Sequence, residues 1–407
     1  MNRVLKNYSS TLLLLSAVII GGICGVIFGE KAAVVAPVGE LFLNFVFVLI
    51  VPLVFFSISS SICSMTRGRS LGRLMLDVLL VFLVMSFIAA LVMYISTLVV
   101  DPLGDIDRDS LIKTLPARQS GDGIGFGAAM VSALSVPDFV LLFSKEHLLP
   151  LIIISALTGW AAAMLGEAGE SVFHFLKTGT DVVMKMMDGV MKLAPIGLGC
   201  YFASIISGLG SQIMGGFLRS FLLYTVVSLL FFFVLNPLYI FLFRGADGLR
   251  AYWTHIWPPS ITAIATTSSA AAMPPGIEAA RRMGVAPEIA ESIVPLGTNL
   301  HKDGSVMAGL LKIVFLMSLF GQDFATPGAA LMVIGLAIIA SLVTGAVPSG
   351  AGTGELLTCM LMGFSPEMVG MMMVISTLVD IPATLMNSSS NVVAAALVDS
   401  LAGRRNR

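Results

Sequence analysis

The sequence has little charge. Only 12% of its 407 residues are Asp, Glu, Lys or Arg, while 57% are hydrophobic, and the mean hydropathy is +0.96. Soluble domains carry roughly twice that share of charge, so the composition predicts an integral membrane protein. The net charge of -1 excludes a basic nucleic-acid surface, because binding phosphate requires clustered Lys and Arg.

Paired cysteines and enzyme signatures are also missing. The four cysteines, Cys24, Cys63, Cys200 and Cys359, stand singly in apolar stretches, which is typical of small buried side chains. No G-x-S-x-G or H-E-x-x-H motif occurs. A membrane enzyme would have to use serines such as 268–269 or 388–390 as the nucleophile with a nearby base, and we expect neither an enzyme nor a cofactor.

What the chain has in abundance is apolar runs. A helix that crosses the roughly 30 Å core of a bilayer needs about 20 apolar residues. The first run follows Arg3 and Lys6 and has no clear A-x-A cleavage site, so we interpret it as a membrane helix and not a signal peptide. The predicted helices cover residues 10–28, 39–62, 74–100, 148–165, 183–206 and 217–243.

Loop charge predicts the orientation. Residues 67–73 are rich in Arg, whereas residues 101–109 carry four aspartates. The positive-inside rule places the first loop in the cytoplasm and the second outside. Further basic residues occur at 244, 250, 281–282 and 404–405. They are also cytoplasmic if the segments 252–283 and 330–362 each enter the membrane and leave it again on the same side. Both termini are predicted to be cytoplasmic.

The most unusual stretch is residues 295–305, where Asn299, His301, Lys302 and Asp303 interrupt an apolar segment. Ionisable groups at membrane depth are costly and usually functional. Polar residues also break the segments on either side, at 260–275, 341–354 and 380–391. Together these breaks predict a binding site inside the membrane.

Two segments look like re-entrant helical hairpins. Residues 252–283 contain two short apolar halves joined by Thr266–Ser269, with basic flanks, and residues 330–362 repeat the pattern with acidic flanks. We predict opposed hairpins, each followed by an interrupted helix, at 287–320 and 366–402. This is an inverted repeat, which places a transport site near the bilayer midplane. The alternative for each hairpin is an ordinary helix with a Gly or Pro kink.

Several motifs resemble those of the dicarboxylate/amino acid:cation symporter family, the glutamate transporter homologues. Leu49–Phe56 is similar to its second-helix Pro-Leu-Val-Phe motif, and Lys192–Gly197 to its fifth-helix Ala-Pro-Ile-Gly. Thr267–Ala270 is similar to its first hairpin tip, and Pro295–Ser305 to its Asn-Met-Asp-Gly-Thr box. The resemblance covers nearly the whole chain.

The resemblance implies an all-α polytopic membrane protein with eight transmembrane helices, two opposed re-entrant hairpins and an elevator mechanism. It implies a homotrimer in the bacterial inner membrane, in contact with lipids. A scaffold would comprise residues 1–73 and 101–210. A mobile transport domain would comprise residues 74–100 and 211–407.

The resemblance also implies the substrate contacts. Asp380 and Asn387 would bind the amino and carboxylate groups, and Thr384 would line the pocket. Further contacts would come from both hairpin tips, at Ser268, Ser269, Thr344, Val347 and Gly350. An ammonium is a suitable partner for Asp380 in an apolar helix; the alternative is a permanent pair with a protein cation.

One departure from the family concerns the substrate. Members that carry acidic substrates have an arginine three residues after the aspartate, where this chain has Ala383. Without a guanidinium there is no evident partner for a second carboxylate. We therefore predict a small neutral amino acid as the substrate.

A second departure concerns sodium. The family's box supplies Asn, Met, Asp and Thr, whereas this chain has His301, Lys302, Asp303 and Ser305. Phe82 and Met85 align with a Tyr and a Thr of the third helix, and Asn391 with a carboxylate. Asp303 would be the only anionic ligand of a sodium ion.

We hypothesise that Lys302 replaces a sodium ion, paired with Asp303 or Asp380, and couples transport to protons or to exchange. His301 is a second candidate proton carrier. The remaining members of the predicted coupling set are Gly297, Asn299 and Asn391. A static Lys302–Asp303 salt bridge, an ordinary sodium-coupled symporter of amino acids or dicarboxylates, and a channel are the alternatives.

Overall fold

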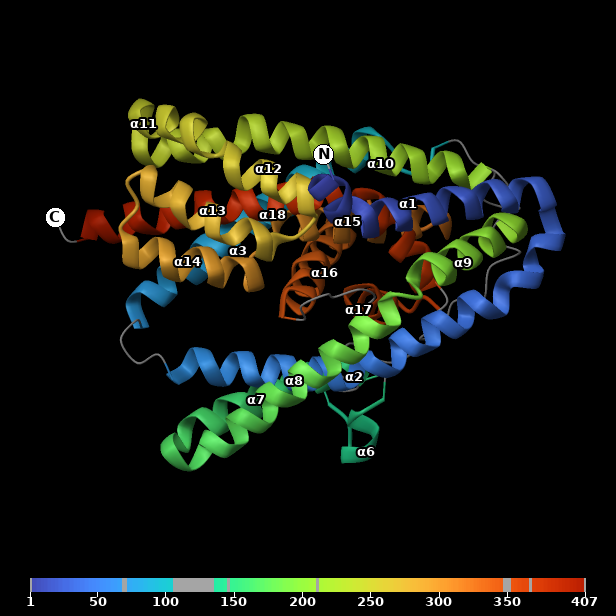
Figure 1. The fold of residues 1–407 in the computed structure, drawn as a ribbon, viewed down its shortest axis with the longest axis horizontal. Coiled ribbons are helices and arrows are strands. Elements are labelled where there is room, and N and C mark those ends of the chain that lie inside the picture. Colours follow the sequence, from blue (N-terminus) through green and yellow to red (C-terminus); the bar gives the residue numbers. More distant parts are fainter. Residues whose placement is uncertain are drawn as a thin grey trace.

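The computed structural model describes residues 2–67, 72–104, 135–144, 147–209, 212–346, 353–365 and 368–405. These residues form helices and connecting turns, with no strand among them (Figure 1). The elements up to residue 209 are α1 (Asn2–Phe28), η1 (Gly29–Val35), α2 (Ala36–Arg67), α3 (Gly72–Val99), α6 (Phe139–Leu142), α7 (Leu148–Met164), η3 (Gly166–Gly169), α8 (Glu170–Met191) and α9 (Ala194–Leu209). The elements that follow are α10 (Gln212–Leu230), the π-turn η4 (Phe231–Leu235), α11 (Asn236–His255), α12 (Trp257–Thr266), α13 (Ser269–Arg282), α14 (Pro287–Leu300), α15 (Asp303–Leu319), α16 (Pro327–Ala346), α17 (Thr353–Leu361) and α18 (Met368–Arg405).

Several of these helices have the length and apolarity of membrane spans. Within the described residues, four stretches qualify, and a bent pair of helices, Gly166–Met191 with Ala194–Gly208, is a fifth candidate. The four are Ser16–Ser60, Asp77–Val99, Ile213–His255 and Met368–Ala402. Their outward faces keep large apolar side chains exposed, such as Val48, Leu83 and Val226. Such faces suit lipid, so the chain is a multi-pass membrane protein.

The helices pack in two groups. In the first, α1 packs on α9, and α2 packs on α7, α8 and α9. In the second, α18 lies at the centre, in contact with α3 and with α10 to α15 (Figure 1). The groups meet where α9 contacts α18 and α2 contacts α16.

The segment predicted as the first hairpin is two short helices, α12 and α13, packed on each other. The chain reverses at Thr267, which has a left-handed φ of 47°. Ser268 then caps α13 by accepting a hydrogen bond from the Ala271 N–H at 3.2 Å. The cap satisfies a helix-terminal donor that has no partner within the helix. In the second predicted hairpin, α16 and α17 likewise contact each other, and the residues between them lie outside the described ranges.

Two predictions about helix continuity have opposite outcomes. The break predicted within 287–320 is present: His301 and Lys302 are non-helical between α14 and α15. The interruption predicted within 366–402 was wrong, because α18 is one continuous helix with Pro382 inside it. The predicted helix 183–206 is also wrong in its bounds: α8 begins at Glu170, and the axis bends by 58° between α8 and α9.

One ion-pair network joins the ends of four helices. Arg244 of α11, beside a kink at Gly245 (φ 67°), pairs with Asp399 of α18. Arg244 also donates to the Met283 carbonyl at 2.8 Å and to the Ala396 carbonyl at 3.2 Å. Asp399 in turn accepts from the Ala286 N–H at 3.1 Å. The network fixes α11, α13, α14 and α18 to one another at this end of the molecule.

Arg244→Ala should therefore lower the thermal stability. Removing the guanidinium leaves Asp399 and two carbonyls without their donor, and hydrogen bonds to charged groups contribute about 1.5–3 kcal/mol each. We expect a fall in Tm of several degrees in detergent solution. Arg250→Ala is the matched control, because Arg250 is exposed on the same helix, and it should leave Tm unchanged. Equal Tm values for the two variants would contradict this role of Arg244.

Candidate functional site

The polar residues of α18 form a stripe on one face of the helix. Asp380, Thr384, Asn387 and Asn391 are spaced by four, three and four residues, which is the repeat of an α-helix. The stripe faces the break between α14 and α15, because Asn387 contacts Ser305 and Asn391 contacts His301. A helical stripe leaves the backbone hydrogen bonds intact, so these polar residues need no break in α18.

Glycines allow α14 and α15 to lie directly on this stripe. A Cβ at Gly304 would lie 2.3 Å from the Ala383 carbonyl oxygen, and one at Gly297 would lie 2.4 Å from Oδ1 of Asn391. Neither distance is possible for a real side chain. The small residues bring the 301–305 segment into contact with the substrate-binding face predicted from the sequence.

His301 and Asp303 form the centre of the site, and both side chains are fully buried. Nε2 of His301 lies 3.0 Å from Oδ1 of Asp303. Nδ1 of His301 lies 3.1 Å from Oδ1 of Asn391. The contact at Nδ1 is a hydrogen bond, whereas Nε2 has no hydrogen-bond partner among the described residues and meets Asp303 only as a close contact. An imidazole of the protein itself, which is a cation when protonated, thus lies against Asp303.

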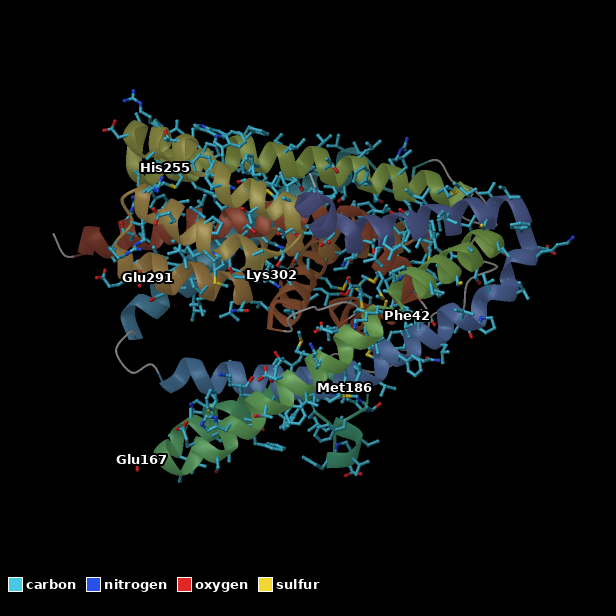
Figure 2. The ribbon with its side chains drawn as sticks, in the orientation of Figure 1. Phe42, Glu167, Met186, His255, Glu291 and Lys302 are labelled. Carbon is cyan, nitrogen blue, oxygen red and sulfur yellow. The ribbon has the colours of Figure 1, made fainter. Side chains whose placement is uncertain are left out.

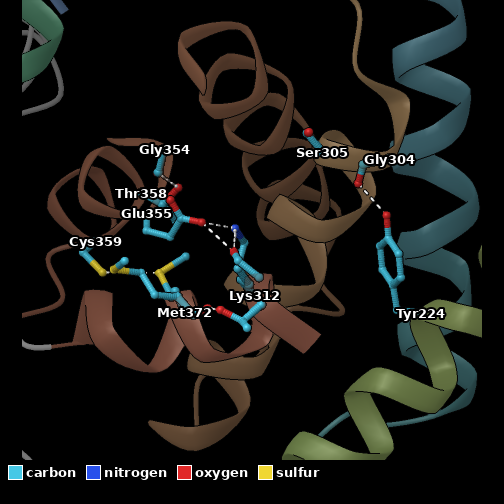
Figure 3. A network of polar contacts seen from close by, with 12 residues as sticks. Tyr224, Gly304, Ser305, Lys312, Gly354, Glu355, Thr358, Cys359 and Met372 are labelled. Atoms are coloured by element: carbon cyan, nitrogen blue, oxygen red, sulfur yellow. Dashed lines mark hydrogen bonds and ion pairs between the residues drawn. The ribbon is translucent and has the colours of Figure 1, made fainter. Parts of the chain in front are cut away.

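Helix α3 completes the surroundings of this pair. The ring of Phe82 stacks on the imidazole of His301, with 4.6 Å between centroids. Ser86 donates to Oδ1 of Asp303 at 3.3 Å. From α10, the Tyr224 hydroxyl donates to the Gly304 carbonyl at 2.7 Å (Figure 3). Sequence reasoning missed Ser86 and Tyr224, because a single Ser or Tyr in an apolar helix is common and carries no motif.

Asn387 is bound to the first turn of α15. Its Oδ1 accepts from the Ser305 N–H at 3.2 Å, and its Nδ2 donates to the Ser305 hydroxyl at 3.3 Å. The side chain therefore satisfies one of the N–H groups that a helix start leaves without a partner in the helix. Any contact with a substrate would add to, or replace, these bonds.

Two charged side chains at the site have no partner of opposite charge. Lys302, labelled in Figure 2, is partly exposed and forms no ion pair within the described residues. Asp380 is also partly exposed, with the Thr384 hydroxyl as its hydrogen-bond partner, and no Lys, Arg or His in the described ranges pairs with it. Neither pairing hypothesised for Lys302, with Asp303 or with Asp380, occurs in the structure; His301 holds Asp303 instead.

The structure does not bring every predicted site residue together. Asn299 is exposed and donates to the Pro295 carbonyl of its own helix at 3.1 Å. Ser268 is used as the cap of α13, and neither it nor Ser269 is hydrogen-bonded to the stripe of α18. The Thr344 side chain, Val347 and Gly350 lie outside the described residues.

The buried pair does not provide an evident sodium site. Sodium requires several hard oxygen ligands, as do other hard cations. Here Oδ1 of Asp303 already faces His301 and Ser86, and the imidazole, when protonated, would repel a second cation. In the part of the chain that the structure describes, no cluster of three His, Cys, Asp or Glu residues could hold a metal ion.

Comparisons with known proteins place these features in one family. The profile of the Sodium:dicarboxylate symporter family matches residues 11–401. The chain belongs to that family. It is therefore a secondary transporter and not an enzyme.

The sodium:dicarboxylate symporter relatives are distant but cover most of the chain. The proton/glutamate-aspartate symporter of Bacillus subtilis (strain 168) is 26% identical over 392 residues, which are 95% of this chain and 93% of that protein. The C4-dicarboxylate transport protein of the same strain is 25% identical, and the alignment covers 86% of this chain and 82% of that protein. The proton/sodium-glutamate symport protein of Bacillus caldotenax is 23% identical, and the alignment covers 96% of this chain and 94% of that protein.

Proposed function

We propose that this symporter-family protein carries a small neutral amino acid, and that the two charges without partners bind it. Asp380 would hold the ammonium group, and Lys302 the carboxylate. The two side chains are of opposite sign, so together they match a zwitterion with no net charge. The contact between Gly304 and Ala383 places the segments that carry them beside each other.

The main support is that no Lys, Arg or His in the part of the chain that the structure describes pairs with Asp380. A partly buried carboxylate in an apolar helix is costly unless it is paired. A substrate ammonium supplies that partner and strong charge-assisted hydrogen bonds. With no arginine at 383, Lys302 is the candidate partner for a carboxylate, and a single ammonium suits one carboxylate better than two.

For coupling, we propose that a protein-borne cation takes the place of a sodium ion, so that transport is driven by protons or by exchange. The sequence favoured Lys302 in this role. The contact between His301 and Asp303 favours His301, because the imidazole already neutralises the carboxylate that would attract sodium.

We also propose an elevator movement, in which the helices around α18 slide against the group formed by α1, α2, α7, α8 and α9. The packing of α18 with α10 to α15 supports treating these helices as one unit. A homotrimer in a bacterial inner membrane, with both termini in the cytoplasm, is part of the same proposal.

A second candidate is a sodium-coupled or proton-coupled carrier of acidic amino acids or dicarboxylates. The names of the relatives favour it, since they describe glutamate, aspartate and C4-dicarboxylates. In that case, Lys302 would bind the second carboxylate of the substrate in place of the missing arginine.

A thermal-shift screen of the purified protein separates the two candidates. Ligands that bind only the folded state raise Tm. We expect shifts with small neutral amino acids, of equal size in sodium and choline buffers, and none with the corresponding amines or carboxylic acids. Shifts with succinate or glutamate, and not with alanine or serine, would overturn the proposal in favour of the second candidate.

A further inference from the structure

A further cation lies beside the polar stripe of α18, one helical turn before Asp380. Ser376 precedes Asp380 by four residues, so the two side chains are neighbours on one face of the helix, about 5–6 Å apart at Cβ. Both residues are partly exposed. The Ser376 hydroxyl lies 2.8 Å from Nζ of Lys312 on α15. The stripe therefore continues past Asp380 to an ammonium group that another helix supplies.

This ammonium group is paired within the protein. Nζ of Lys312 lies 2.5 Å from Oε1 of Glu355 on α17, and Figure 3 shows the two side chains directed at each other. The Ser376 hydroxyl donates to the same carboxylate oxygen at 2.7 Å. Lys312 is 8% exposed and Glu355 is 5% exposed. Glu355 thus neutralises Lys312 at this end of the stripe.

Stability alone does not account for an ion pair at this place. Replacing a buried pair with apolar residues of similar volume is often neutral or stabilising. The residues that follow Glu355 on α17, Leu356 and Leu357, are apolar and buried, so apolar side chains suit these surroundings. Because the pair lies at the end of the stripe that carries Asp380, its charges point to a role in the choice of cargo.

The spacing along the stripe matches the length of an acidic amino acid. The ammonium and the side-chain carboxylate of aspartate or glutamate are roughly 5 Å apart, close to the ~5.4 Å pitch of an α-helix. With its ammonium at Asp380, such a cargo would extend its second carboxylate along the stripe towards Ser376 and Lys312. There it would meet the carboxylate of Glu355, and like charges repel strongly where water is scarce.

We propose that Glu355 makes the site selective for neutral cargo, because it occupies Lys312, the cation that would otherwise hold a second carboxylate. The inference rests on the proposed binding of the cargo ammonium by Asp380, and it gives the proposed preference for neutral amino acids a physical cause. Specificity often depends on such a repulsive element, which acts against the wrong ligand and adds no contact to the right one. The Glu355 carboxylate takes the place of an acidic side chain of the cargo.

Removing the charge of Glu355 should therefore create binding, which the loss of a merely structural ion pair does not do. In Glu355→Gln the side chain keeps its size, and the Lys312 ammonium stays buried without an anion. A cargo carboxylate would restore the pair, so we expect glutamate and aspartate to bind about tenfold or more tighter than to the parent. Glutamine and asparagine have the same shapes without the charge. The variant should thus prefer glutamate to glutamine, which reverses the order expected for the parent.

The affinities are measured on the purified full-length protein by titration with glutamate, aspartate, glutamine, asparagine and alanine, with Tm as the signal. Two variants serve as controls. Glu355→Asp keeps the charge and should still reject the acidic amino acids. Lys312→Met/Glu355→Met removes the cation as well, and it should gain no affinity for them. A gain in Glu355→Gln that the double variant lacks assigns the new binding to the ammonium of Lys312.

Folded Glu355→Gln that still rejects glutamate and aspartate would overturn the proposal, and so would an equal gain in the double variant. If Glu355→Gln folds poorly, it is purified in excess glutamate or excess glutamine. Recovery with glutamate alone is then expected, and equal yields in the two ligands overturn the proposal. A parent protein that binds glutamate but not alanine or glutamine refutes both this inference and the proposed function. A failure confined to the variant leaves the proposed function standing.

Discussion

Asp380→Asn should weaken the binding of a neutral amino acid by about 30-fold or more. The change removes the charge that we assign to the substrate ammonium but keeps the size of the side chain. Removing one partner of a desolvated, hydrogen-bonded charge pair costs about 2–5 kcal/mol or more, and each 1.4 kcal/mol is about tenfold in Kd. The change in Kd is measured by titrating the purified variant and the parent with alanine or serine, with Tm or the heat of binding as the signal.

The same substitution separates an amino acid from a dicarboxylate as the cargo. If the cargo is a dicarboxylate, removing a negative charge at position 380 should leave its affinity unchanged or raise it. Thr377→Val is a suitable control, since Thr377 lies on the same helix and its hydroxyl bonds to the Met373 carbonyl; it should bind the amino acid like the parent. A variant at position 380 that binds alanine with parental affinity would exclude the proposed ammonium contact.

Replacing both His301 and Lys302 should create sodium dependence. The double variant His301→Asn/Lys302→Met restores the residue types that the family resemblance implies around sodium. It also removes the charge of Lys302 and the imidazole that lies against Asp303, and supplies an amide oxygen in place of the imidazole. We expect uptake by the parent in liposomes to be equal in sodium and choline, and uptake by the double variant to be at least tenfold faster in sodium.

The single variants show how much each residue contributes to the sodium independence of uptake. Lys302→Met alone should stay independent of sodium, because His301 still neutralises Asp303, but should bind its substrate more weakly. Asn299→Ala serves as the control, because this exposed side chain bonds only within its own helix. A strict requirement for sodium in the parent protein would refute the replacement of sodium by a protein-borne cation.

The sequence allowed some elements to be predicted from local chemistry. The break at His301 and Lys302 was predictable, because adjacent polar residues in an apolar segment mark non-helical backbone at a site. The turn at Thr267 was predictable from a Thr/Ser cluster between two short apolar halves. At Thr267 the turn also supplies the cap, Ser268, whereas at His301 and Lys302 the Ser305 N–H at the start of α15 is satisfied by Asn387 of α18.

Other features depend on packing that no local pattern reveals. The stripe of α18 was interpreted as a break, although its spacing of four, three and four residues already matched an unbroken helix. His301, and not Lys302, lies against Asp303, and its imidazole stacks on Phe82 of α3, which is far away in the sequence. The contact between Lys312 and Glu355 joins residues 43 positions apart, and neither belongs to a motif.

The unbroken helix α18 also determines where the site lies in depth. Its 38 residues span about 57 Å at 1.5 Å per residue, well beyond the roughly 30 Å of a bilayer core. The stripe from Asp380 to Asn391 occupies the middle of this length, so it is almost equally far from the two ends. If the middle of α18 lies at the bilayer midplane, as the predicted inverted repeat implies, a cargo held at the stripe would have a path of similar length to either solution.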